Sequence, residues 1–221
     1  MKLAALYSGG KDSTYAVYLA KKTGHKISVL TTIISENPDS FMFHTSNIGI
    51  TMMLAENMGL RLAMKKSFGE KEKEVEDIKI AVKDLEVDGI VCGAIESEYQ
   101  RKRVEKVCKD LDLELVVPLW KKDQAQLLRD MIKDDFKIMI TSVSAEGLDE
   151  SWLGRIIDEE CIKDLEKLNK KHGINIAGEG GEFCTIVLNC PLFNKELKIT
   201  DSEKQWDGSA GKLIIKDGKF I

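Results

Sequence analysis

Ser8-Gly9-Gly10-Lys11-Asp12-Ser13 lies between an apolar run, Leu3 to Tyr7, and a helix-like run, Thr14 to Lys22. This order of strand, glycine turn and helix places the unpaired N–H groups of a helix N-terminus around the turn. The two adjacent glycines let the backbone approach a bound group closely, and the helix dipole favours negative charge at this end. The stretch therefore predicts an anion site that suits a phosphate.

The side chains of the loop strengthen this prediction. Lys11 supplies a mobile positive charge, Ser8 and Ser13 supply hydroxyl donors, and Asp12 can either cap the helix or hold a magnesium ion. The sequence of this loop matches neither G-x-x-x-x-G-K-[ST] nor G-x-G-x-x-G, which are the phosphate-binding motifs usually sought. The simpler alternative is a capped turn whose polar residues are only solvated.

Length, charge and cysteine content narrow the class of protein. With 221 residues the chain can bury a self-sufficient core. A net charge of −4 with 32% charged residues predicts an interspersed, solvated surface, which disfavours stable nucleic-acid binding. Neither a signal peptide nor a membrane-length apolar run is visible, so we expect a cytoplasmic protein without membrane contact. Reduced thiols fit this, because the sequence has no C-x-x-C pair among Cys92, Cys108, Cys161, Cys184 and Cys190.

Over residues 1–135, β-rich apolar runs alternate with helical patterns, which is typical of a parallel sheet with crossover helices. Strands are expected at Leu3–Tyr7, Ile27–Ile34, Arg61–Met64, Gly89–Cys92 and Glu114–Val117. Helices are expected at Ser13–Lys22, Ser46–Met58, Glu70–Leu85, Glu98–Leu111 and Asp123–Ile132. Ligands of such sheets bind beyond the carboxyl ends of the strands, where Ser8 falls.

The alternation of apolar runs and helical patterns changes after residue 135. We therefore expect a smaller α+β domain over 136–221 that packs tightly on the first domain, with a cleft between them. Its expected elements are a strand at Lys137–Val143, a helix at Ile156–His172 ended by Gly173, strands at Thr185–Cys190 and Leu197–Thr200, and a hairpin turning at Asp217-Gly218. The predicted domain boundary depends on this change of sequence pattern alone.

Two polar clusters follow predicted strands of the first domain. His44, in the stretch 43–47, either contacts a phosphate, orients a substrate carboxylate or caps the following helix. In the stretch 93–105, Tyr99 and Arg103 share one helix face, apart from the apolar stripe of Val104, Val107 and Leu111.

Arg103 suits two-point capture of a phosphate or carboxylate, and Glu96 suits a base or a metal contact. Gln100 completes the substrate-binding candidates on this helix. The alternative is an exposed, salt-bridged helix.

Two further clusters lie in the second domain. Glu146, Asp149 and Trp152 stand between a strand and a helix, where they can form a substrate wall. In the stretch 178–182 glycines turn the chain sharply and bring Glu179 and Glu182 toward one point, although a loop with solvated acids is the alternative. Cys184 has no assignable His partner and is given no role.

Seven stretches in order resemble the diphthine-ammonia ligase family of the PP-loop ATP pyrophosphatases: SGGKDS (8–13), FHTSN (43–47), GAIESEYQRKRVE (93–105), PLW (118–120), GLDESWLGR (147–155), GEGGEFCT (178–185) and PLF (191–193). The resemblance spans essentially the whole chain. One departure is Cys184, where the family commonly has an acidic residue. The resemblance implies an adenine nucleotide alpha hydrolase-like (HUP) domain, ATP and Mg²⁺ as cofactors, and elongation factor 2 bearing diphthine as partner.

The implied reaction is ATP-dependent amidation of diphthine to diphthamide through an acyl-adenylate, with release of AMP and pyrophosphate. Lys11, Ser13 and the loop amides would stabilise the departing pyrophosphate. Glu179 or Glu182 would act as base or ammonium anchor, and the trimethylammonium of the substrate would lie against acids or aromatics such as Tyr99 or Trp152.

Free ammonium is the expected nitrogen source, unless a partner supplies ammonia. Residue 2 is Lys, so no N-terminal nucleophilic cysteine is available, and no domain-sized segment remains for a glutaminase. A homodimer is left open. Two alternative functions also remain open: a PP-loop ligase that modifies tRNA, and an adenine nucleotide sensor without turnover.

Overall fold

A computed structural model describes residues 1–35, 49–67 and 73–221, so the candidate His44 lies outside the described residues. The chain divides into two compact units, Met1–Trp120 and Lys121–Ile221. We expected a division after residue 135. The helix at Gln124–Lys133 (α5) belongs to the second unit, where it packs against the helix at Glu159–His172 (α6).

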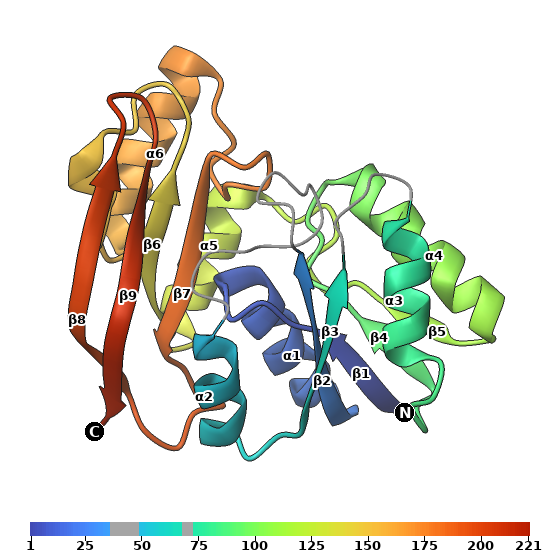
Figure 1. The fold of residues 1–221 in the computed structure, drawn as a ribbon. Coiled ribbons are helices and arrows are strands. Elements are labelled where there is room, and N and C mark those ends of the chain that lie inside the picture. Colours follow the sequence, from blue (N-terminus) through green and yellow to red (C-terminus); the bar gives the residue numbers. More distant parts are fainter. Residues whose placement is uncertain (36–48, 68–72) are drawn as a thin grey trace. The chain divides into compact units, whose positions relative to one another are not determined.

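The first unit contains a five-stranded parallel sheet in the order β3-β2-β1-β4-β5, which confirms the predicted α/β fold (Figure 1). Its strands are β1 (Lys2–Leu6), β2 (Lys26–Ser35), β3 (Leu62–Ser67), β4 (Gly89–Val91) and β5 (Glu114–Val116). Its helices are α1 (Lys11–Lys22), α2 (Ile50–Asn57), α3 (Glu74–Val82) and α4 (Glu98–Leu111). The predicted bounds of α4 are confirmed, whereas α1 begins two residues earlier than its expected start at Ser13.

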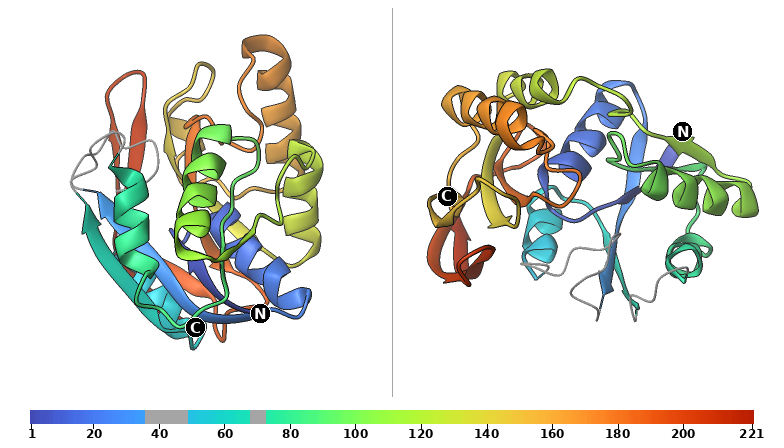
Figure 2. Two further views of the ribbon diagram at one scale, coloured as in Figure 1. Left: turned by 90° about the vertical axis from the view of Figure 1, so that its right-hand side faces the viewer. Right: turned by 90° about the horizontal axis from the view of Figure 1, so that it is seen from above.

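Helices cover both faces of this sheet. In Figure 2, α1 and α2 lie on one side of the strands and α3 and α4 on the other. Leu3, Ala4 and Ala5 are therefore all buried, as expected for a parallel strand between two helical layers. Strands β2 and β3 follow on one side of β1, and β4 and β5 follow on its other side. The carboxyl ends of β1 and β4 therefore form the switch point, where ligands of such sheets bind.

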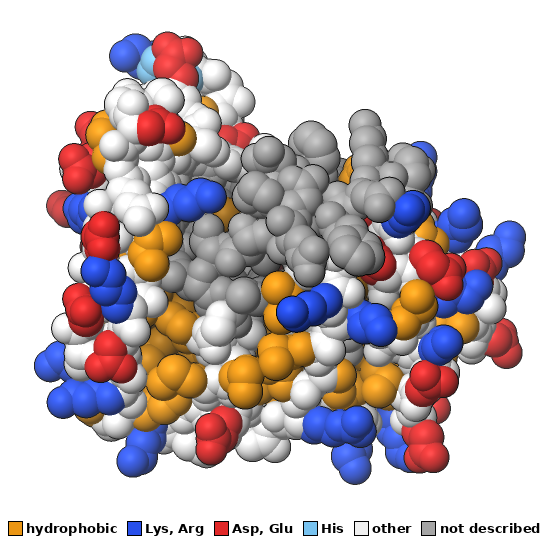
Figure 3. All heavy atoms as spheres, viewed as in Figure 1, with side chains coloured by type: hydrophobic (Ala, Val, Ile, Leu, Met, Phe, Trp, Pro, Cys, Tyr) orange, Lys and Arg blue, Asp and Glu red, His pale blue; other side chains and the backbone are white. Residues whose placement is uncertain are grey.

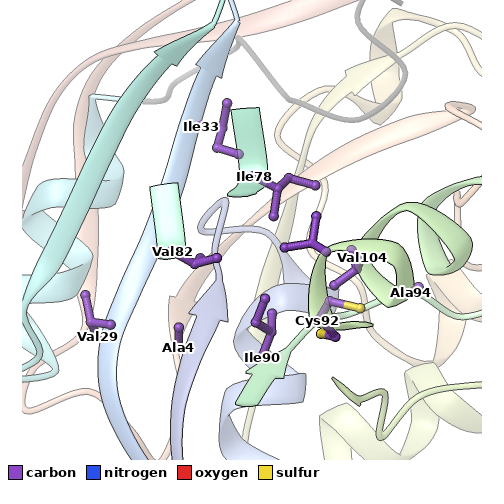
Figure 4. Close-up of a cluster of buried hydrophobic side chains, with 11 residues drawn as sticks. Ala4, Val29, Ile33, Ile78, Val82, Ile90, Cys92, Ala94 and Val104 are labelled. Carbon is purple, nitrogen blue, oxygen red and sulfur yellow. The ribbon is translucent and has the colours of Figure 1, made fainter. Parts of the chain in front are cut away.

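A hydrophobic cluster joins the sheet to α3 and α4 (Figure 4). Ile78 and Val82 of α3 and Val104 and Val107 of α4 pack with strand residues such as Ile90. The expected apolar stripe of α4 is thus confirmed, and it fixes which face of α4 points away from the sheet.

The second unit contains a four-stranded antiparallel sheet in the order β7-β6-β9-β8. Its strands are β6 (Lys137–Val143), β7 (Phe183–Asn189), β8 (Leu197–Trp206) and β9 (Gly211–Phe220), and a short 3₁₀ helix, η1, spans Glu150–Trp152. Helix α6 starts later than the expected Ile156, because the Asp158 side chain accepts the Cys161 N–H (2.8 Å) and caps it. It ends at Gly173 (φ +73°), as predicted.

The predicted hairpin turn at Asp217-Gly218 is wrong. Both residues lie inside β9, where Asp217 is paired with Asp201 of β8. The turn falls at the other Asp-Gly pair, where Gly208 has φ +102° and the Asp207 side chain accepts the N–H groups of Ser209 and Ala210, each at 2.8 Å. An Asp-Gly pair marks a turn locally, but strand pairing decides which pair is used.

The surface drawn in Figure 3 carries Lys and Arg side chains interspersed with Asp and Glu, and hydrophobic side chains lie over α2 and β3. Met52 on α2 and Met64 on β3 are exposed. Within the described residues, no helix has the length and apolarity needed to cross a membrane.

Candidate active site

The predicted phosphate loop forms a tight turn from β1 into α1. Gly9 has φ +79°, and a Cβ there would lie 3.0 Å from Leu54 Cδ1, so both backbone and space favour glycine. Gly10 is the N-cap residue, and the first intrahelical bond is donated by Thr14 N–H to Gly10 O (3.1 Å). The amides that precede Thr14 therefore belong to the open first turn, which is the part of a helix that binds anions.

Two serines hold this turn in shape. Ser13 Oγ accepts the Ser8 N–H (3.2 Å), donates to Gly10 O (3.2 Å) and lies 3.1 Å from Ser8 Oγ. The hydroxyls that the sequence assigned to a ligand thus also fix the backbone that would receive it.

Lys11 and Asp12 form the charged part of the loop. Lys11 is only 2% exposed, and its Nζ lies 2.7 Å from Asp12 Oδ2. Asp12 does not cap the helix, which excludes one of its two expected roles. Its Oδ1 is buried and accepts no hydrogen bond within the described part of the chain. A buried carboxylate oxygen without a donor is unfavourable, and a hard cation such as Mg²⁺ would satisfy it.

The segment between β4 and α4 lies directly against this loop. A Cβ on Gly93 would fall 2.6 Å from the Asp12 carbonyl carbon and 2.8 Å from Ser13 N. Three residues after Ala94, Ser97 caps α4 by accepting the Gln100 N–H (3.3 Å). The loop at Ser8–Ser13 and the start of the polar stretch 93–105 therefore meet at the switch point between β1 and β4.

Tyr99 and Arg103 share a face of α4 as predicted, and both contact a residue that sequence reasoning missed, Glu74 of α3. The Tyr99 hydroxyl donates to Glu74 Oε2 (2.8 Å), and Arg103 Nε lies 3.1 Å from the same oxygen. The Arg103 guanidinium also stacks on the Tyr99 ring, 3.3 Å from its centroid. Glu74 sits in the stretch KEKEVED (71–77), whose mixed charges read as a solvated helix, so no local signal marked it.

The opposite side of α4 agrees with the alternative interpretation of this helix, an exposed helix with salt bridges. Arg101 pairs with Glu98 and Glu105 and stacks over Trp120 (5.0 Å). Glu96 is exposed, and Gln100 is half-buried at the start of the helix.

In the second unit, the glycine-rich turn is organised by Asn175, which the sequence did not suggest. Asn175 Oδ1 accepts the N–H groups of Ala177 (2.9 Å) and Glu179 (3.3 Å), and its own N–H donates to Glu182 Oε1 (2.9 Å). Glu182 Oε2 is buried and has no hydrogen-bond partner among the residues that the structure describes. The carboxylate of Glu182 is therefore held at one oxygen and open to a donor at the other.

Ser144, which directly follows β6, is hydrogen-bonded to the glycine-rich turn at residues 178–182. Its N–H donates to Glu182 O (2.8 Å) and its Oγ donates to Gly181 O (2.7 Å). Cys184, next along β7, is half-buried and donates its backbone N–H to Ser142 Oγ (3.2 Å).

The three candidates for a substrate wall have separate surroundings. Glu146 is 83% exposed in its side chain and lies 3.1 Å from His172 Nδ1. Asp149 caps η1, and hydrogen bonds from the Ser151 hydroxyl and N–H lower the pKa of its carboxyl group. Trp152 is 6% exposed, with the Arg155 guanidinium 4.5 Å over its ring. Trp152 is therefore among the buried side chains of this unit.

A parallel sheet with a glycine turn and an open helix N-terminus at its switch point defines the first unit as an α/β domain of the nucleotide-binding type. The family models for the N-terminal and C-terminal domains of diphthamide synthase match residues 1–115 and 123–221. The chain belongs to the diphthamide synthase family.

Named relatives agree with this assignment. Diphthine–ammonia ligase of Homo sapiens is 38% identical, with 92% of this chain and 84% of that protein covered, and the Danio rerio protein of the same name is 36% identical, with 92% and 88% covered. The Schizosaccharomyces pombe ligase is 36% identical, but this chain covers only 37% of it. A solved structure, a predicted subunit of tRNA methyltransferase from Methanocaldococcus jannaschii, aligns at a TM-score of 0.45 and 16% identity over 86% of this chain and 97% of that chain, which is too distant to bear on function.

Proposed function

We propose that this protein is an ATP-dependent, AMP-forming ligase that converts the diphthine carboxylate on elongation factor 2 to the amide of diphthamide, with ammonium as the nitrogen donor. The observation that carries the proposal is the 38% identity to human diphthine–ammonia ligase across 92% of this chain. The proposal places the enzyme in the cytoplasm, where translation factors work.

The reaction needs activation, because a carboxylate and ammonia at neutral pH form a salt and not an amide. In the proposed first step a carboxylate oxygen attacks the α-phosphorus of ATP, the bond to the bridging oxygen breaks, and pyrophosphate leaves. In the second step ammonia attacks the acyl carbon, AMP leaves, and the attacking nitrogen loses a proton. Groups that stabilise these changing charges more strongly in the transition state than in the ground state raise the rate.

The turn at Ser8–Ser13 is the proposed site for the phosphates. The open amides of the first turn and the glycine backbone would bind phosphate oxygens, and Lys11 would add its positive charge as pyrophosphate departs. The Oδ1 of Asp12, which has no donor among the described residues, fits a magnesium ion, and such an ion would neutralise phosphate charge. Lys11 would then exchange its contact with Asp12 for one with phosphate.

Glu182 is the stronger of the two candidates for handling ammonium. Its Oε1 is fixed by the Asn175 N–H, and its buried Oε2 lacks a donor in the described chain. An ammonium N–H would satisfy that oxygen, and the carboxylate would then accept the proton that must leave before nitrogen attacks. Glu179 remains the alternative.

The trimethylammonium group of the substrate needs an aromatic face or a carboxylate. Tyr99 and Trp152 each already carry an arginine guanidinium on the ring, and Trp152 is buried as well. We therefore assign the trimethylammonium to the neighbourhood of Tyr99 and not to Trp152.

The proposal is tested by measuring pyrophosphate release from ATP with purified factor carrying diphthine, with and without ammonium. Release that needs the unamidated factor supports it. Release with tRNA and none with the factor would replace it with the tRNA-modifying alternative, and tight ATP binding without any release would favour the sensor. Size-exclusion chromatography of the same preparation decides between a monomer and a homodimer.

A further inference from the structure

Glu74 is a buried carboxylate at the first turn of α3 that contacts two candidate substrate residues of α4. It is 2% exposed and binds Tyr99 and Arg103 through one oxygen. The Arg103 side chain is itself only 13% exposed. An ion pair, a phenol and a stacked guanidinium are thus gathered in one buried cluster, which we name the Glu74 cluster.

Stability alone does not explain this cluster. The buried part of the α3–α4 interface is otherwise apolar among the described residues, with Ile78 and Val82 packed near Val104 and Val107. Burying an ion pair costs desolvation of both charges, and apolar residues of similar size are often as stable or more so. A polar cluster at this place therefore points to a role besides joining two helices.

The position of the cluster suggests that role. Glu74 and Tyr99 lie in the first turns of α3 and α4, at the carboxyl end of the sheet. The segment that leads into α4 is the one whose Gly93 lies against Asp12 and Ser13. The cluster therefore stands on the same helix start that borders the phosphate loop.

We propose that Glu74 is a positioning residue, which orients the Arg103 guanidinium and the Tyr99 ring for the zwitterionic side chain of diphthine. This inference rests on the proposed function. Glu74 is too buried to touch the substrate and acts through its two neighbours. Its Oε2 lies 3.1 Å from Arg103 Nε and restrains the guanidinium by charge attraction, and by accepting the Tyr99 hydroxyl it restrains the ring.

The chemistry of the cluster matches that of the substrate group. Diphthine carries a carboxylate beside a trimethylammonium, so its site needs a cationic and an electron-rich partner side by side. A fixed guanidinium suits the carboxylate, and an aromatic ring suits the quaternary ammonium. The carboxylate of Glu74 balances the positive charge of the Arg103 guanidinium. The guanidinium can therefore keep its position without attracting the other anions of the site.

The test compares Glu74→Gln with wild type in steady-state turnover of diphthine-bearing factor and in calorimetric binding of ATP with magnesium. We expect kcat/KM for the factor to fall about 10–100-fold, because the side chains it controls lose their orientation. We expect ATP affinity to change by less than about twofold, since the loop at Ser8–Ser13 is untouched. Turnover of the diphthine-bearing factor by the wild-type protein tests the proposed function by itself. The ratio of kcat/KM between Glu74→Gln and wild type tests the positioning role.

The chain offers a matched control in Lys79 and Asp110, a second ion pair between α3 and α4 (3.2 Å), placed nearer the other end of α4. Asp110→Asn should leave kcat/KM unchanged. If Glu74→Gln behaves like Asp110→Asn, the positioning role is wrong and Glu74 only joins the helices.

Arg103→Gln and the double variant complete the cycle. Because Glu74 acts through Arg103 and Tyr99 together, the double variant should lose less than the product of the two single losses, whereas losses that multiply in full would overturn the inference. Should Glu74→Gln fail to fold, Tyr99→Phe carries the test, because it removes only the hydroxyl that Glu74 accepts. A raised KM for the factor at unchanged ATP affinity supports positioning, and unchanged kinetics contradict it.

Discussion

Gly93 lies so close to Asp12 that a side chain on Gly93 would collide with the Asp12 backbone, at 2.6 Å from its carbonyl carbon and 2.7 Å from its oxygen. The start of α4 is thereby held against the start of α1. One half of this contact belongs to the predicted phosphate loop and the other leads to Tyr99 and Arg103. The helix that carries the residues assigned to substrate is thus joined to the loop assigned to ATP by backbone packing at Gly93.

Gly93→Ala should weaken ATP binding. The new methyl group meets backbone and not a flexible side chain, so the loop itself must shift, at a cost of about 1–3 kcal/mol. We expect calorimetry to show ATP affinity lowered about tenfold. Gly49→Ala is the matched control, because a Cβ there meets nothing within 4 Å. Equal affinity in the two variants would mean that the contact does not position the loop.

Lys11→Met should abolish pyrophosphate formation while the protein stays folded. The variant keeps the bulk of the side chain but loses the charge that balances leaving pyrophosphate, and we expect a rate loss of about 10²-fold or more. Circular dichroism checks the fold. Lys21→Met, at the exposed end of α1, serves as control and should turn over normally. A Lys11→Met rate near that of wild type would remove Lys11 from the mechanism.

Glu182→Gln should separate the two half-reactions. Exchange of labelled pyrophosphate into ATP reports carboxylate activation and should persist, while amide formation falls about 10²-fold because the proton acceptor is gone. Glu179→Gln, whose backbone N–H is held in the same turn by Asn175, should affect amide formation less. The reverse order of the two variants would assign the base to Glu179.

The buried thiols should make the protein less stable in alkali. Burial raises the pKa of Cys108 and Cys190 from 9.0 to about 12 and that of Cys161 to about 11. Above pH 9 the unfolded chain therefore loses these protons while the folded chain keeps them. The free energy of unfolding should fall as pH rises from 9 toward 11, by less than about 1.4 kcal/mol per pH unit for each thiol.

Urea unfolding at pH 8 and pH 10 measures this change, with denaturant slopes compared to check that both curves report the same transition. A thiol reagent added to the native protein should modify half-buried Cys184 before the three thiols with raised pKa. Stability that stays level up to pH 10 would show that these thiols ionise in the folded state.

Much of the fold follows from local sequence signals. Alternation of apolar runs and amphipathic helices predicts the parallel sheet, and the structure confirms the predicted helix Glu98–Leu111 and the predicted helix end at Gly173. The failures come from long-range pairing. Asp217-Gly218 and Asp207-Gly208 carry the same turn signal, and only the pairing of β8 with β9 shows that the second pair makes the turn.

The candidate site shows a similar division. The loop at Ser8–Ser13 is predictable, because its residues are neighbours in sequence and its backbone conformation is encoded by two glycines. Glu74 and Asn175 are not predictable, because each matters only through partners on other elements, which no local pattern reveals. The burial of Trp152 is likewise a property of the folded unit that its neighbours in sequence do not reveal.

The most direct test of the account is a single-turnover reaction with labelled ammonium, ATP and diphthine-bearing elongation factor 2, followed by mass spectrometry of the factor and chromatography of the nucleotides. The account predicts that label enters the factor as an amide and that AMP and pyrophosphate form in equal amounts with it. Formation of ADP, or AMP formation that proceeds equally without the factor, would contradict it.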